Sequence, residues 1–288
     1  MKQIAIPLLA GMVFCCTQAP AQKLEFKEHI SKEFQVANAS GSVLSIYNMN
    51  GAIKVEGYSG DKVVFEIDKT IRAKESAILE EGKKEFQLQM EQKDDSIIAY
   101  ISEPFDTRPK RNQQNWEEKK KIFYQYELNF VVKVPFALNL HISTVNGGDV
   151  QISDVTGSLG IYNVNGAIKV TNAKGATQMR TVNGNVDANF VSAPAGVSSF
   201  KTINGNINIV YPPSLSADCE YKSFNGGFYT DFPDAFALPP TVTKTELKDD
   251  SKTVYKLNKE SAIRIGNGGA NKLRFETFNG NIYIKKQS

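Results

Sequence analysis

Side chains capable of acid–base, nucleophilic or metal chemistry are few in this sequence, and they do not cluster. The two histidines, His29 and His141, lie far apart, and Cys219 has no candidate base near it in the chain. No Gly-x-Ser-x-Gly, His-Glu-x-x-His or phosphate-binding loop occurs. We therefore predict no catalytic, cofactor-binding or metal-binding residues.

Acidic residues are sparse where a repeat dominates the sequence. Asp149, Asp154 and Asp187 are the only acids between residues 146 and 210. Carbohydrate-active enzymes built on β-helices need carboxylates clustered on one face. Asp149 and Asp187 both follow Asn-Gly pairs, which leaves a shared face open to them, but a structural role is favoured. A polysaccharide lyase or hydrolase remains the alternative to a binding protein.

The repeat itself is an apolar residue, Asn-Gly, a small or polar residue, and then alternating apolar and polar positions. Five copies follow one another at intervals of 18 to 21 residues, and two more are separated from them by longer inserts. The predicted structural turns are Asn50-Gly51, Asn146-Gly147, Asn165-Gly166, Asn183-Gly184, Asn204-Gly205, Asn225-Gly226 and Asn279-Gly280.

Asn and Gly adopt tight-turn backbone conformations at low steric cost, so each pair predicts a corner. A second turn, as at Gly157 and Gly175, divides several repeats into two short strands. The alternation predicts one inward face per strand. By parity we place Val164, Ile168 and Val170 inside one repeat, and Ile203, Ile207 and Ile209 inside another.

Two architectures fit this pattern. One is a meander of hairpins with type I′ turns at Asn-Gly, and the other is a solenoid in which each repeat is one coil stacked on the last. Near-identical copies favour stacking, because like residues then lie over like. We predict an all-β, single-domain β-solenoid with parallel β-helix-like coils.

The first 21 residues resemble a secretory signal peptide. Lys2 precedes an apolar run from Ile4 to Phe14, and Ala19-Pro20-Ala21 fits a cleavage site. Cys15 and Cys16 raise a lipoprotein as the rival, but Phe14 is a poor residue before a lipidated cysteine. We expect an exported protein, in the periplasm, at the cell surface or secreted, and no later segment is apolar enough to span a membrane.

The segment 62–134 does not follow the repeat. It predicts a strand (62–71), a short helix (73–86), a hairpin (86–102) and a strand (123–134), an insert ahead of regular coils over 141–288. The basic loop 108–121 is interpreted as solvated, because Glu117 and Glu118 interrupt its charge. The insert 231–262 has no assigned role.

These elements, in this order, resemble the bacterial putative-adhesin family, a family of unknown function in cell envelopes. The resemblance rests on the early coil, the insert, the strand Val132-Lys-Val-Pro135, the Thr-Val-Asn-Gly coils and the turn Gly266-Asn-Gly-Gly269. It covers most of residues 22–288, and it implies a β-solenoid without assigned enzymatic activity.

The predicted function is therefore that of a non-catalytic envelope protein whose repetitive surface binds a glycan or a surface protein. An envelope-stress regulatory component is a further alternative. The formal net charge is +3, and falls to +2 without the signal because only Lys2 is lost, so nucleic acid is not an expected partner. Exposed strand edges at the coil ends favour self-association. Tyr47, Tyr162, Tyr229 and Tyr283 would add stacking contacts if exposed, although parity in several coils favours inward packing.

Overall fold

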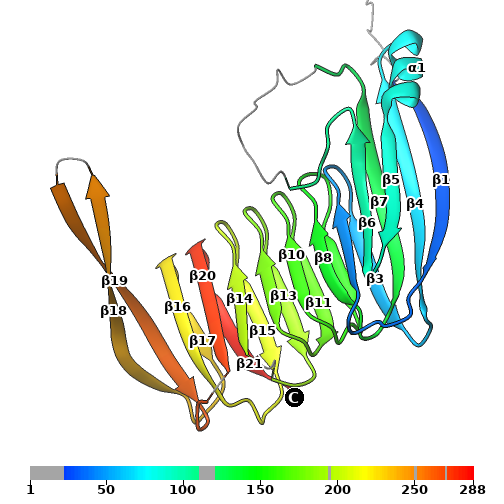
Figure 1. Ribbon diagram of the computed structural model, residues 1–288. Coiled ribbons are helices and arrows are strands. Elements are labelled where there is room, and N and C mark those ends of the chain that lie inside the picture. The colour runs from blue at the N-terminus through cyan, green and yellow to red at the C-terminus, as the bar shows by residue number, and fades with distance from the viewer. Residues whose placement is uncertain (1–22, 110–120, 194–195, 250–251, 270) are drawn as a thin grey trace, which may run out of the picture.

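The computed structural model describes residues 23–109, 121–193, 196–249, 252–269 and 271–288 (Figure 1), with the side chains of 241–260 left undescribed. The predicted signal peptide 1–21, with Cys15 and Cys16, and most of the basic loop 108–121 lie outside these ranges. Among the described residues, no helix has both the length and the apolar character needed to cross a membrane.

Two long sheets make up almost the whole fold. The ten-stranded sheet runs in the order β1 (Leu24–Gln35), β4 (Lys62–Ala73), β7 (Gln125–Pro135), β3 (Ile53–Tyr58), β9 (Val150–Ser153), β11 (Ile168–Ala173), β13 (Val186–Phe190), β15 (Ile207–Tyr211), β21 (Ile282–Lys286), β17 (Phe228–Thr230). The eleven-stranded sheet runs in the order β18 (Phe236–Asp249), β19 (Lys252–Ile265), β16 (Ala217–Asn225), β20 (Lys272–Asn279), β14 (Val197–Lys201), β12 (Thr177–Arg180), β10 (Leu159–Tyr162), β8 (Asn139–Ser143), β2 (Val43–Tyr47), β6 (Ser96–Glu103), β5 (Gln87–Lys93).

Each repeat is one coil that gives one strand to each sheet, as in β10 and β11. Neighbouring coils pair in parallel with like residues opposite, for example Ile161 with Met179 and Ile168 with Val186. The apolar side chains between the sheets form one continuous core, in which Ile168 and Val186 are fully buried. The predicted all-β solenoid, with its one short helix, is confirmed. We name each coil below after its corner asparagine.

Two of the residues predicted to point inward do not. Ile168, Val170, Ile207 and Ile209 are buried, but Val164 is only half-buried and Ile203 is 37% exposed. In the Asn165 coil, the odd-numbered residues are buried in the strand before the corner, and the even-numbered residues are buried in the strand after it. Because the corner takes up an odd number of residues, parity counted through it gives the wrong side.

The coils do not stack in chain order at the C-terminal end. Strand β20 lies between β14 and β16, and β21 lies between β15 and β17. The last coil of the chain, that of Asn279, is therefore inserted between the Asn204 and Asn225 coils. In the insert 231–262, β18 and β19 form a long antiparallel hairpin that projects from the stack (Figure 1).

The N-terminal end of the stack is closed by antiparallel structure. β4 pairs with β1 on one side and with β7 on the other, and the β5–β6 hairpin extends the second sheet. The predicted short helix is α1 (Ser76–Glu85). Its Gly82 is buried against the ring of Tyr124, where a Cβ would overlap that ring, which explains a glycine within a helix.

Candidate binding surface along the Asn-Gly corners

All seven predicted corners lie along one edge of the molecule, and their asparagines form a ladder. Each Nδ2 donates to the Oδ1 of the neighbouring asparagine, at 2.8 Å for five of the six steps and at 3.3 Å for the step from Asn146 to Asn50. The ladder runs through Asn50, Asn146, Asn165, Asn183, Asn204, Asn279 and Asn225.

The residue two positions before each corner asparagine turns inward and satisfies a backbone carbonyl. Thr202 Oγ1 donates to Gly184 O at 2.8 Å, and Thr277 Oγ1 donates to Gly205 O at 3.0 Å. Thr144, Thr181 and Ser223 make the equivalent bond. Asn and Asp side chains beyond the corner accept from the next coil, so the stacked corners leave few backbone groups unpaired.

The corner glycines are required mainly because the stacked backbones approach closely. A Cβ at Gly184 would overlap the carbonyl of Gly166, and one at Gly280 would overlap that of Gly205. A clearly left-handed backbone occurs at two corners, with φ of 119° at Gly51 and 78° at Gly147. The hairpin type I′ turn, which needs left-handed φ at both central residues, is therefore not what these corners use.

The apolar residue directly before each corner asparagine forms a row along the stack. In stack order this row is Met49, which packs against the core, then Val145, Val164 and Val182, which are half-buried, and then Ile203, Phe278 and Phe224, which are exposed. Its exposure is largest at the C-terminal end, where Phe278 is 48% and Phe224 is 71% exposed. The two phenyl rings stack with centroids 4.7 Å apart and planes 4° from parallel. Contiguous exposed apolar side chains of this kind make this edge a candidate contact surface.

A second outward row lies three positions before the asparagines, on the eleven-stranded sheet. Its C-terminal members are Arg180, Lys201, Glu276 and Lys222 in stack order. Lys201 Nζ pairs with Glu276 at 2.8 Å, whereas Arg180 and Lys222 make no ion pair with another described residue. Together the two rows line a groove, which we call the corner groove: Arg180, Lys201, Thr202, Ile203, Lys222, Phe224, Glu276, Thr277 and Phe278.

A second hollow adjoins the corner groove on the same sheet. It is lined by Ser199, Glu220, Tyr221, Lys222, Arg274, Phe275 and Glu276. Arg274 Nε pairs with Glu220 at 2.7 Å, so both carboxylates of this region, Glu220 and Glu276, face a cation. Sequence reasoning missed the groove residues, although the change from Val to Phe before Asn225 and Asn279 was a visible signal.

The four tyrosines for which the sequence pattern favoured inward packing lie on the outer faces of the sheets. Tyr47 and Tyr162 flank His141, with ring centroids 5.4 and 5.2 Å from it. Tyr229 and Tyr283 stack at 5.1 Å on the ten-stranded sheet, and Tyr229 is 51% exposed. Burial between the tyrosines lowers the pKa of His141, which keeps the ring neutral at neutral pH.

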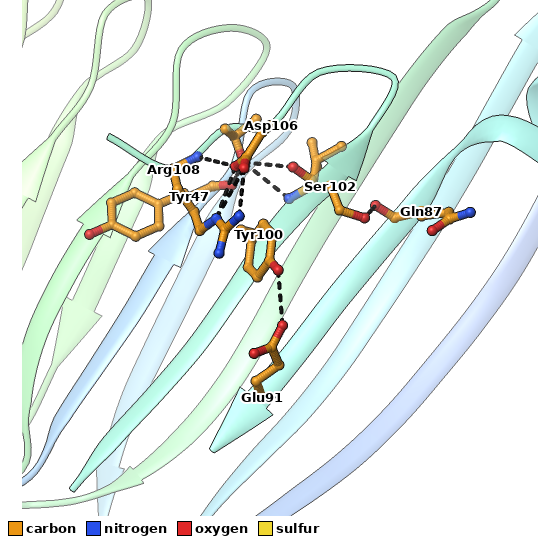
Figure 2. A network of polar contacts seen from close by, with 9 residues as sticks. Tyr47, Gln87, Glu91, Tyr100, Ser102, Asp106 and Arg108 are labelled. Carbon is orange, nitrogen blue, oxygen red and sulfur yellow. Dashed lines mark hydrogen bonds and ion pairs between the residues drawn. The ribbon is translucent and has the colours of Figure 1, made fainter. Parts of the chain in front are cut away.

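The loop that follows β6 is held by a polar network (Figure 2). Arg108 pairs with Asp106 at 2.6 Å and lies over the ring of Tyr100, whose hydroxyl donates to Glu91 at 2.9 Å. Thr107 Oγ1 donates to Tyr47 O at 2.7 Å. This network fixes the start of the basic loop against β6. The charge of Arg108 is paired with Asp106 within the network.

The acids that could have formed an enzymatic site are separated by role. Asp149 sits at the corner and accepts from the backbone of Ala167 at 2.8 Å, whereas Asp187 lies on the outer face of β13 and accepts from Asn208 at 2.6 Å. They do not share a face. His29 bridges Asp68 and Glu66 on the outer strands β1 and β4. No cluster suited to a metal ion occurs among the described residues.

Cys219 is fully buried in the core, and burial raises the pKa of its thiol to about 12. A thiol in this state is not a nucleophile at neutral pH, because the thiolate is the reactive form.

Two of the solved structures that match the chain are named for adhesion. One is a putative cell adhesion protein from Clostridium sporogenes ATCC 15579, 12% identical at a TM-score of 0.45, with 91% of this chain and 100% of that chain covered. Another is a putative adhesin from Bacteroides fragilis NCTC 9343, 12% identical at a TM-score of 0.36, with 89% and 97% covered. No curated protein sequence matches the chain.

The family comparison is the decisive one. The model of the family described as Toastrack DUF4097 matches residues 137–285, which is more than half of the chain and includes six of the seven corners. With the observed coils, the chain therefore belongs to the Toastrack DUF4097 family.

Proposed function

We propose that this protein is an exported, non-catalytic component of the cell envelope that adheres to a glycan or a surface protein through the outer faces of its coils. The observation that carries the proposal is the corner groove, where two stacked, exposed phenyl rings lie beside a row of charged side chains. Side chains on such a repetitive surface contact a polymer at many points, each contributing weakly.

The chemistry of the groove supports binding rather than turnover. Glu276 pairs with Lys201 at 2.8 Å and Glu220 pairs with Arg274 at 2.7 Å. A glycosidase needs two carboxyl groups that face the glycosidic bond, whereas both carboxylates of this region face protein cations. The groove instead offers apolar and cationic contacts.

The C-terminal end of the stack supports self-association as a second part of the proposal. β17 is the last strand of the ten-stranded sheet, its outer edge pairs with no other described strand, and its three residues carry no charge. An uncharged open edge pairs readily with a strand of another chain. Analytical ultracentrifugation of the mature protein, with Tyr229→Lys as the variant, tests this part: a dimer that the lysine disrupts is expected, and a wild-type monomer at all concentrations contradicts it.

Binding is tested with mature protein on an array of bacterial and host glycans and on immobilised extracellular proteins. The test variant is Phe224→Ala/Phe278→Ala. The control variant is Lys54→Gln/Lys169→Gln, which changes two exposed lysines on the opposite sheet. We expect wild type and the lysine variant to bind, and the phenylalanine variant to lose binding. Release of sugar fragments from a bound polysaccharide would overturn the non-catalytic assignment.

Export is tested separately by fractionating cells and sequencing the mature N-terminus. Cleavage after Ala21 would give Gln22 at the N-terminus, in agreement with the expected signal peptide. A lipid-modified cysteine would establish the lipoprotein instead, and an intact Met1 in the cytoplasm would contradict export.

A further inference from the structure

The corner groove runs along the axis of the stack, across the strands rather than along them. Its two sides are the apolar row Ile203, Phe278 and Phe224 and the charged row, whose members come two positions earlier in the same coils. Because each coil contributes one residue to each side, the groove repeats at the strand spacing of about 4.8 Å. A ligand that fills it therefore has a period close to that distance.

The charge along the groove is unbalanced. Lys201 and Glu276 neutralise each other in the two central coils. Arg180 in the Asn183 coil and Lys222 in the Asn225 coil remain without an ion-pair partner among the described residues. These two cations lie three strand spacings apart, about 14 Å, with Phe278 and Phe224 on the other side.

We propose that the corner groove binds an acidic polysaccharide, a linear chain whose sugars carry carboxylates, laid along the stack with about one sugar ring per coil. Its carboxylates pair with Arg180 and Lys222, and the C–H faces of its rings contact Ile203, Phe278 and Phe224. This inference rests on the proposed function and names the ligand class of the same surface.

The spacing favours a polysaccharide over an extended peptide. A peptide strand advances about 3.3 Å per residue, and its side chains return to one face only every second residue. Neither distance matches one coil. An extended pyranose chain advances by nearly the coil spacing per ring, and every ring offers both an apolar face and a site for a carboxylate.

The arrangement of the cations also favours a polymer over a single small anion. Arg180 and Lys222 are too far apart to hold one carboxylate together, and each is exposed, so each pair alone is weak. Binding by both requires a ligand that spans the four coils. Affinity should therefore rise with chain length until the groove is filled.

Titration calorimetry with purified mature protein tests the proposal, using oligogalacturonates of two, four and six sugars and neutral cello-oligosaccharides of the same lengths. We expect the six-sugar acid to bind, the two-sugar acid to bind much more weakly, and the neutral chains to bind at least about tenfold more weakly than their acidic counterparts, the scale of one charge-assisted contact. Arg180→Gln/Lys222→Gln should lower the affinity for the six-sugar acid by about tenfold or more.

The matched control is Lys54→Gln/Lys169→Gln, which removes the same charge from the opposite sheet and should leave the affinity unchanged. Circular dichroism melts of both variants exclude unfolding as the cause. Equal binding of neutral and acidic chains, or equal loss in both double variants, would overturn the inference while the broader binding function stands. If no glycan and no protein binds in the array experiment, the proposed function itself fails.

Discussion

The two ends of the stack differ in how they stop the coils from continuing. At the N-terminal end the outermost strand, β1, is twelve residues long and rich in Glu and Lys, and it pairs antiparallel with β4. At the C-terminal end the ten-stranded sheet stops at β17, which has three residues and no charge. Charged edge strands resist pairing with other chains, and uncharged ones do not. The comparison teaches that the ten-stranded sheet ends in a long charged strand at one end and in a short uncharged strand at the other.

The same contrast appears in the side chains. The outer strands of the closed end carry ion pairs between exposed groups, such as Lys62 with Glu33 and Arg72 with Glu25. The coils at the open end carry stacked rings, and their asparagines continue the ladder that joins the coils. Surface ion pairs contribute little stability each. Substitutions in the buried and laddered positions of the coils are therefore expected to cost more than the loss of one of these ion pairs.

The largest effect is expected from Phe275→Ala in the inserted strand β20. Phe275 is 2% exposed and stacks on Phe200 with centroids 5.2 Å apart, so its loss should cost about 3–5 kcal/mol. Hydrogen exchange should rise in β16 and β17 but not in β1, β4 and β7. The control is Phe278→Ala, three residues along the chain but facing outward, which should cost less than about 1 kcal/mol. Faster exchange at both ends would contradict the separation of the two regions.

A smaller effect is expected from Thr202→Val, which preserves shape and removes one hydroxyl. The Gly184 carbonyl at the buried corner then loses its 2.8 Å bond, at a cost of about 1–3 kcal/mol in urea unfolding. Thr171→Val provides the comparison, because Thr171 lies on an outer face and makes no side-chain hydrogen bond to another described residue. Equal costs for the two variants would show that the corner bond is not what stabilises the coil.

The asparagine ladder distinguishes the interior of the stack from its open end. Asn183 bonds to asparagines on both sides, whereas Asn225 bonds to one. Asn183→Ala should therefore destabilise by about 1–2 kcal/mol, and Asn225→Ala by about half as much. Thermal unfolding of both variants checks this order. A larger loss at Asn225 would mean that the open end is covered in solution.

The smallest effect concerns the two histidines, one at the closed end and one over the coils. Hydrogen bonds to Asp68, at 2.8 Å, and Glu66, at 2.7 Å, raise the pKa of His29, while burial lowers the pKa of His141. The contribution of His29 to the free energy of unfolding is thus fully present below the unfolded pKa, about 6.5. It is lost as pH rises through the folded pKa. The contribution of neutral His141 to the free energy of unfolding is present above about pH 6.5 and is lost as pH falls through the folded pKa.

NMR titration of the two imidazoles measures this directly, with His29→Gln assigning the signals. We expect one ring to titrate above pH 6.5 and the other below it. If the two rings titrate at the same pH, the expected opposite shifts of the two histidine pKa values are contradicted.

Sequence reasoning identified the corners because Asn and Gly have distinctive backbone requirements, and it identified Ile168 and Ile207 as core because alternation within one strand is reliable. It misplaced Val164 and Ile203 because the corner changes the parity, which no local pattern reveals. The short helix and the strands of the insert were predicted from composition and alternation, and they appear at nearly the expected residues.

The position of the last coil was not predictable. The corners at Asn204, Asn225 and Asn279 present the same chemistry, so any of the three coils fits beside any other by local criteria. The long hairpin of β18 and β19 carries the chain outward and back, and this excursion allows β20 and β21 to insert. The corner groove follows from that insertion, because it places Phe278 between Ile203 and Phe224.

The order of the coils is therefore the claim on which the groove and the open end both depend, and cysteine cross-linking tests it most directly. Adjacent parallel strands bring corner residues within disulfide reach, and Cys219 does not compete because it is buried. The account predicts rapid disulfide formation for the pairs Asn204→Cys/Asn279→Cys and Asn225→Cys/Asn279→Cys, and none for Asn204→Cys/Asn225→Cys. A disulfide in the third pair, without those in the first two, would contradict it.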